Sequence, residues 1–106
     1  MKLLTQALEK RFAEVGSQEN EKDPIFIAKF FHPVVGFYWF ASEYDPKTKC
    51  FFGYASLFHD INDEWGSFSL EELESVKKFG LGVERDLFFK ETRSSEIIKN
   101  IEYLQL

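Results

Sequence analysis

The residues best able to do chemistry lie between Asp60 and Glu74, where carboxylates recur without an intervening lysine or arginine. Six carboxylates give this stretch more negative charge than the net −5 of the whole chain. Grouped carboxylates attract a basic partner, and aromatic rings among them can anchor it. We therefore predict a partner-binding surface composed of these residues: Asp60, Asp63, Glu64, Trp65, Phe68, Glu71, Glu72 and Glu74.

A structural interpretation of the same acids stays open. Glu71 and Glu72 fall where a helix is expected to begin, and the helix dipole favours negative charge there. The acids that precede Trp65 are also ordinary residues of a solvated turn. On this interpretation the cluster is a hydrated loop followed by a helix N-terminus, without a binding role.

The spacing of the acids resembles a calcium-binding loop only in part. Four residues occupy positions 1, 3, 5 and 12 of an EF-hand-like loop: Asp60, Asn62, Glu64 and Glu71. Position 6, which requires glycine for its sharp turn, is Trp65, and no clear helix precedes the loop. We predict no metal site and no cofactor.

Two histidines and one cysteine are the other candidates for metal binding or catalysis. His32 precedes a proline in a turn, and His59 ends an expected strand, so both are expected at the surface or at an edge. Cys50, next to Phe51 and Phe52, is expected to be a small buried apolar residue. The chain contains no nucleophile elbow, phosphate-binding glycine loop or HExxH pattern, so no catalytic residue is predicted.

Arg85 is the remaining residue of interest. Strand alternation places it on the same face as the apolar residues Val83, Leu87 and Phe89. A cation on such a face needs a partner, either an acid of the second helix or the sheet surface along its stem. The alternative is recognition of a ligand carboxylate or phosphate in a small cleft.

The predicted fold that positions these residues is α+β, a single globular domain spanning residues 1–106. Apolar residues at helical spacing predict a helix over 3–15, and the polar stretch 17–23 reads as a surface connection. Three aromatic runs, 25–31, 37–44 and 50–58, predict an antiparallel meander. The middle run is apolar on both alternating faces, which places it at the centre of the sheet.

The second half of the chain adds two helices and one or two strands. Residues 59–66 read as a loop, and Phe68 marks a short strand or turn. Ser69 with Glu72 forms a capping box for a helix over about 70–78. Residues 83–89 alternate as a strand, and Ser94 or Ser95 can cap a final helix. The sheet is therefore mainly antiparallel, with four to five strands and with N-terminal, middle and C-terminal helices.

Composition limits the possible functions. Aromatic residues make up 18% of the chain, including 13 phenylalanines, which supports a substantial core in a small domain. The net charge of −5 opposes approach to nucleic acid, and no apolar run is long enough to span a membrane. A single cysteine and an early-charged start without a signal-peptide pattern lead us to expect a cytoplasmic protein.

Two stretches carry a family resemblance: FFGYASLFHDINDEWGSFSLEELES over 51–75 and LGVERDLFF over 81–89. They resemble an uncharacterised family of small bacterial proteins, domain of unknown function 2958. The opening MKLLT and the segments DPIFIAKFF and FYWFASEYDP resemble it more loosely, so the similarity reaches about residue 90 and leaves out the last helix. The resemblance implies a mobile-element context, such as a plasmid or phage. It implies no established activity and supplies no catalytic residues.

These observations favour a non-enzymatic protein-binding module of mobile-element type. Its acidic and aromatic face would bind or inhibit a host protein with a basic surface, such as a nucleic-acid-handling component of a defence system. Two alternatives stay open. One is a small-ligand-binding protein or enzyme with its site around Arg85. The other is a homodimer that associates through the aromatic face of the sheet.

Overall fold

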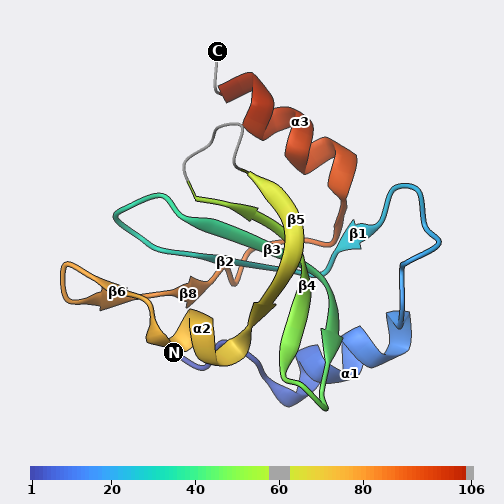
Figure 1. Cartoon of the computed structure of the whole chain (residues 1–106), viewed down its shortest axis with the longest axis horizontal. Coiled ribbons are helices and arrows are strands. Elements are labelled where there is room, and N and C mark those ends of the chain that lie inside the picture. Colours follow the sequence, from blue (N-terminus) through green and yellow to red (C-terminus); the bar gives the residue numbers. More distant parts are fainter. Residues whose placement is uncertain (58–62, 105–106) are drawn as a thin grey trace.

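The computed structural model describes residues 1–57 and 63–104, and a five-stranded antiparallel sheet organises them (Figure 1). Its strands are β2 (Ala28–Phe31), β3 (Tyr38–Asp45), β4 (Cys50–Ser56), β5 (Glu64–Ser69) and β8 (Glu84–Arg85). Their order across the sheet is β5-β4-β3-β2-β8, and every neighbouring pair is antiparallel. The prediction of an α+β fold is confirmed, and so is the central place of the middle aromatic run, which is β3.

Helices and short strand pairs complete the described chain. The helices are α1 (Gln6–Val15), α2 (Leu70–Ser75) and α3 (Ser94–Leu104). Strand β1 (Ile25–Phe26) pairs with β9 (Thr92–Arg93), and β6 (Lys77–Lys78) pairs with β7 (Leu81–Gly82) as a small hairpin. Within the described ranges, no helix has both the length and the apolar character needed to cross a membrane.

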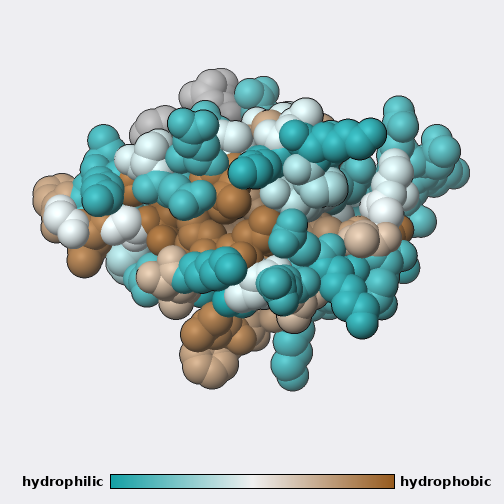
Figure 2. Space-filling view, turned by 90° about the horizontal axis from the view of Figure 1, so that it is seen from below, coloured by the Kyte–Doolittle hydropathy of each residue, from teal (hydrophilic) through white to brown (hydrophobic). Residues whose placement is uncertain are grey.

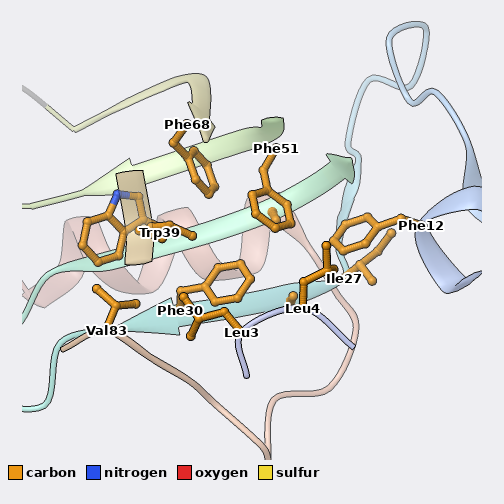
Figure 3. Close-up of a cluster of buried hydrophobic side chains, with 12 residues drawn as sticks. Leu3, Leu4, Phe12, Ile27, Phe30, Trp39, Phe51, Phe68 and Val83 are labelled. Atoms are coloured by element: carbon orange, nitrogen blue, oxygen red, sulfur yellow. The ribbon is translucent and has the colours of Figure 1, made fainter. Parts of the chain in front are cut away.

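Strand β3 supplies rings to two separate cores, one on each face of the sheet. Trp39 belongs to the core that α1 and α2 cover, together with Phe30, Phe51 and Phe68. Figure 3 shows these rings gathered in one cluster, with Phe12 of α1 closing one side. The opposite core contains Phe26, Phe40 and Tyr54, and Ile101 of α3 covers it. Each face of the sheet therefore has its own helical cover.

The helix ends are fixed by hydrogen bonds of known types. The Thr5 hydroxyl accepts a hydrogen bond from the Leu8 N–H at 3.2 Å and so caps α1, which begins later than the predicted residue 3. Gly16, at φ 67°, donates its N–H to the Phe12 carbonyl and ends the helix. The predicted capping box of Ser69 and Glu72 is present at the start of α2.

The start of α3 is capped from a distance. The Asp23 carboxylate accepts hydrogen bonds from the Ser95 N–H at 2.9 Å, the Ser95 hydroxyl at 2.7 Å and the Ser94 hydroxyl at 3.0 Å. We predicted that Ser94 or Ser95 would itself be the cap, and this was wrong because both donate to Asp23 instead. This contact ties the surface connection before β1 to the helix that covers the second core.

Several predicted boundaries are also corrected. The run 25–31 is two strands, because β1 pairs with β9 whereas β2 pairs with β3. Glu64 and Trp65 belong to β5 rather than to a loop, because pairing with β4 extends the hairpin through them. The middle helix ends at Ser75, since Val76 is extended and the chain then forms the β6–β7 hairpin.

The last predicted strand, 83–89, is shorter than expected. Only Glu84 and Arg85 pair with β2. The Asp86 carboxylate then accepts a hydrogen bond from the Phe88 N–H at 2.9 Å and turns the chain. Leu87 is therefore exposed, and Phe89 packs against the core under α3 instead of sharing a face with Val83.

Gly53 and Gly66 face each other on β4 and β5 and provide a matched test of this sheet. A Cβ at Gly53 would overlap the carbonyl oxygen of Phe40, whereas one at Gly66 meets nothing within 4 Å. We expect Gly53→Ala to lower the free energy of unfolding by about 2–3 kcal/mol and Gly66→Ala to change it by less than about 0.5 kcal/mol. Urea denaturation followed by circular dichroism measures both; equal effects would contradict the described β3–β4 packing.

The Asp23 cap also makes a prediction for acid stability. Hydrogen bonds from the Ser95 hydroxyl and N–H lower the pKa of the Asp23 carboxyl. The unfolded chain therefore binds this proton at higher pH, so the stabilisation is complete above the unfolded pKa of about 4 and is lost as the pH falls through the folded value. We expect Asp23→Asn to flatten the fall in melting temperature below about pH 5.

Glu19→Gln serves as the control, because the Glu19 carboxylate makes none of these bonds to α3. Melting temperatures of the three proteins over the acid range decide the matter. If Asp23→Asn and the wild-type protein lose stability in parallel, the cap does not contribute in the way described.

Candidate functional site

The predicted partner-binding residues do not form one surface. Trp65 and Phe68 of β5 point to opposite faces of the sheet: Trp65 contacts the rings of Phe26 and Tyr54, whereas Phe68 stacks on Phe51. Phe68 is only 5% exposed, so its ring belongs to the core and not to a binding surface. Asp60 lies outside the described residues.

The acids likewise point in several directions. Asp63 accepts a hydrogen bond from the Ser56 hydroxyl at 2.7 Å. Glu71 and Glu74 line a hollow with Lys49. Glu64 and Glu72 line a different groove, and Glu72 also takes part in the capping box. The single acidic patch predicted from the sequence is therefore divided between separate surfaces.

The most distinctive acidic and aromatic surface is one that the sequence did not predict as a unit. We call it the aromatic hollow; its volume is about 580 Å³. Its floor contains Phe52 and Trp65, whose rings stack with centroids 6.0 Å apart. They are 41% and 37% exposed, which is unusual for two large rings on an otherwise covered sheet face. The charged residues of its wall are Glu19, Glu21, Lys22 and Glu43.

The two rings of the hollow are held by the sheet. Trp65 lies 5.4 Å from Phe26 and 5.8 Å from Tyr54, measured between ring centroids, so its inner side is packed against the core under α3. Phe52 lies on β4 opposite Glu43, where the register of β3 shifts. A β-bulge of this kind redirects side chains. The bulge thus sets Glu43 beside the exposed ring.

The wall of the hollow is fixed by the side chain of Gln18. Its amide nitrogen donates to the carbonyls of Ile25 at 2.9 Å and Ser42 at 2.8 Å, and its amide oxygen accepts from the Ile25 N–H at 2.8 Å. One side chain therefore attaches the 17–24 segment to β1 and β3. The sequence predicts only a surface connection over residues 17–23, and nothing in its composition signals these long-range bonds.

The electrostatics of the aromatic hollow suit a cation. Three carboxylates, Glu19, Glu21 and Glu43, outnumber the single Lys22 on its wall, and Glu21 also lies 3.7 Å from the Arg93 guanidinium. The faces of aromatic rings attract cations, and Trp provides the strongest such site. A lysine or arginine side chain placed over Trp65 would be attracted both by these carboxylates and by the face of the ring.

A second surface lies on the other face of the sheet, between β5 and the α2–β6 segment. We call it the mixed-charge groove; its volume is about 630 Å³. Its apolar lining includes Phe37, Trp39, Leu57 and Val76. The charged residues of its lining are Glu64 of β5, Glu72 of α2, and Lys77 and Lys78 of β6. Figure 2 shows apolar side chains gathered within hydrophilic surroundings in the half of the molecule that carries β6.

Arg85 lies apart from both surfaces. It pairs with Phe30 across β2 and β8, and its Nε is buried without a hydrogen-bond partner among the described residues. Across residues 1–57 and 63–104, the predicted ion pair with an acid of the second helix is absent. Arg85 lines neither the aromatic hollow nor the mixed-charge groove, so neither supports a ligand site around it.

His32 is buried, which corrects its predicted place at the surface. Its Nε2 lies 3.2 Å from the Lys78 carbonyl oxygen and 3.0 Å from that of Leu81. Its Nδ1 accepts from the backbone N–H groups of Val34 and Val35, which assigns the proton of the neutral ring to Nε2. The ring therefore joins the end of β2 to the β6–β7 hairpin.

The remaining chemical candidates give no site. In the described part of the chain, no three residues among His, Cys, Asp and Glu lie close enough to hold a metal ion. Cys50 is half-buried rather than fully buried, and its thiol lies 3.6 Å from the Thr48 carbonyl oxygen. His59, Asp60 and Asn62 lie outside the described residues, so the calcium-loop spacing has no structural counterpart to compare.

Comparison with known proteins gives one match. A family described as "Protein of unknown function (DUF2958)" matches residues 3–101. The match includes most of α3, whereas we expected the similarity to end near residue 90. No curated protein and no solved structure matches the chain. The chain therefore belongs to the DUF2958 family of proteins of unknown function.

Proposed function

We propose that the protein is a non-enzymatic binding module that accepts a basic side chain of a host protein in the aromatic hollow. The observation that carries the proposal is the exposed, stacked pair of Phe52 and Trp65 inside a mostly acidic wall. Large exposed rings next to charge are typical of the few residues that supply most of the energy of a protein interface.

The same face of the sheet already holds one lysine in this manner. The Lys29 ammonium lies 4.8 Å from the centroid of the Tyr38 ring and 3.7 Å from the Asp86 carboxylate. A ring and a carboxylate therefore bind a cation together within this fold. A cation over Trp65 would gain about 0.5–1 kcal/mol while exposed and about 2 kcal/mol once a partner excludes water.

The acidic wall would contribute mainly to attraction at a distance. Glu19, Glu21 and Glu43 act together with the net charge of −5 to draw a basic surface toward the hollow. Surfaces that handle nucleic acid are basic. Together with the mobile-element context that the family resemblance implies, this supports a nucleic-acid-handling defence protein as the host partner.

The acids of α2 contribute less to this proposal than the sequence predicts. Glu71 and Glu74 lie beside Lys49 in a hollow that contains no exposed ring. Without an aromatic anchor, exposed carboxylates provide long-range attraction that salt screens. Glu71 and Glu74 therefore serve as a matched control for the acids of the aromatic hollow, because they carry the same charge at a site without an exposed ring.

The comparison uses two double variants: Glu19→Lys/Glu43→Lys in the hollow and Glu71→Lys/Glu74→Lys on α2. Binding of short arginine- and lysine-containing peptides is measured by isothermal titration calorimetry. We expect the hollow variant to lose about tenfold or more in affinity and the α2 variant to lose about threefold or less, although both change the net charge equally. Equal losses would mean that only total charge matters, and would contradict a site in the hollow.

Phe52→Ser tests the ring without changing any charge. Removing this half-exposed side chain takes away one ring of the stack and leaves the buried contacts of Trp65 with Phe26 and Tyr54 in place. We expect the variant to keep its melting temperature within about 3 °C and to lose about fivefold or more in peptide affinity. Unchanged affinity would remove the aromatic pair from the proposal.

Affinity capture from host lysate at two salt concentrations, with the Phe52→Ser variant as control, would identify the partner.

A further inference from the structure

The β6–β7 hairpin has an unfavourable residue at its tip. Lys78 pairs with Leu81, so Phe79 and Gly80 are the two central residues of the turn. Both have positive φ, 56° and 74° respectively, which is the pattern of a type I′ turn. Asn-Gly or Gly-Gly suits such a turn, whereas a bulky residue at positive φ is strained.

The Phe79 side chain is also 79% exposed, so its ring gains little from burial within its own molecule. Leu81, on the other strand of the hairpin, is exposed as well. The tip therefore carries two costs, a strained backbone and an exposed ring. Strain of this kind is found at sites of function, where contacts made in the functional state offset it.

The neighbouring charges indicate what covers the tip. Lys77 and Lys78 precede Phe79 and line the mixed-charge groove together with two acids, Glu64 and Glu72. A partner surface of a single charge would be repelled either by the two lysines or by the two acids. A second copy of the same chain, related by a two-fold axis, carries the same two acids and two lysines, so its acids meet lysines and its lysines meet acids.

We propose that two copies of this chain associate through the mixed-charge groove, with Phe79 of each copy seated in the groove of the other. Lys77 and Lys78 of one copy then lie against Glu64 and Glu72 of the second. Phe79 meets the apolar lining that includes Trp39 and is removed from water, which offsets the strain of its turn. The contact is reciprocal because Lys77 and Lys78 of the hairpin themselves line the groove.

The position of the hairpin is fixed before association. Hydrogen bonds between the buried His32 ring and the carbonyls of Lys78 and Leu81 hold both strands of the hairpin to the end of β2. Such preorganisation lowers the ordering cost of binding. The aromatic hollow lies on the opposite face of the sheet, under which α3 packs, so the dimer leaves it open.

The test is the mass of the full chain in solution, measured by sedimentation equilibrium over a range of concentrations. Wild-type protein is expected to reach twice its chain mass of 12.5 kDa. Phe79→Asn places the preferred residue in the type I′ turn. At concentrations low enough for both proteins to be monomeric, we expect its melting temperature to equal or exceed that of the wild type, whereas its dimer dissociation constant rises about tenfold or more. The melting temperature therefore distinguishes a folded monomer from a misfolded one.

A charge exchange tests the pairing of the lysines of one copy with the acids of the other. Lys77→Glu/Lys78→Glu alone and Glu64→Lys/Glu72→Gln alone are expected to be monomers; glutamine keeps the capping box at Glu72. When the two variants are mixed, they should form a heterodimer, because the β6–β7 hairpin of each variant then meets a groove of opposite charge on the other. A monomeric wild type, a Phe79→Asn dimer of unchanged affinity, or a mixture that stays monomeric would each overturn the proposal. Peptide binding in the aromatic hollow is measured separately and does not depend on this result.

Discussion

Strand β3 is apolar on both of its faces, and this constraint shapes the rest of the molecule. Trp39 and Phe40 are neighbours in the chain, yet they belong to cores on opposite sides of the sheet. Both sides must therefore be covered. Helices α1 and α2 cover one side and α3 covers the other, and each leaves part of the sheet beside it open. The aromatic hollow and the mixed-charge groove are these two uncovered parts.

The close packing of β3 against β4 links the core to the aromatic hollow. Gly53 lies so near the Phe40 carbonyl that no side chain fits, and the register of β3 shifts between Ala41 and Glu43 immediately beside it. The shift sets Glu43 next to Phe52, and Gln18 binds the Ser42 carbonyl at the same place. Gly53, the bulge in β3 and the Gln18 side chain therefore lie together at one place in the sheet. The hollow depends on backbone geometry as much as on the residues that line it.

Local sequence patterns predicted most of the helices and strands. The two candidate binding surfaces depend on contacts between residues that are far apart in the sequence. The central place of β3 followed from its apolar alternation, and the capping box at Ser69 followed from two residues three apart. By contrast, the start of β5 at Glu64 and the end of α2 at Ser75 depend on pairing partners that no local pattern reveals. The acidic cluster was read as one surface because its residues are consecutive. Strand alternation separates Trp65 from Phe68, and that could have been predicted had β5 been recognised.

We propose that a basic partner binds at the face under α3 and not at the acidic helix α2. The most direct measurement is a titration of the isotope-labelled protein with an arginine-containing peptide, followed by two-dimensional NMR. We expect shift changes at the Trp65 indole N–H, at the Gln18 side-chain amide and at the backbone of Glu43. Changes confined to Glu71 and Glu74, with the Trp65 signal unmoved, would contradict this proposal.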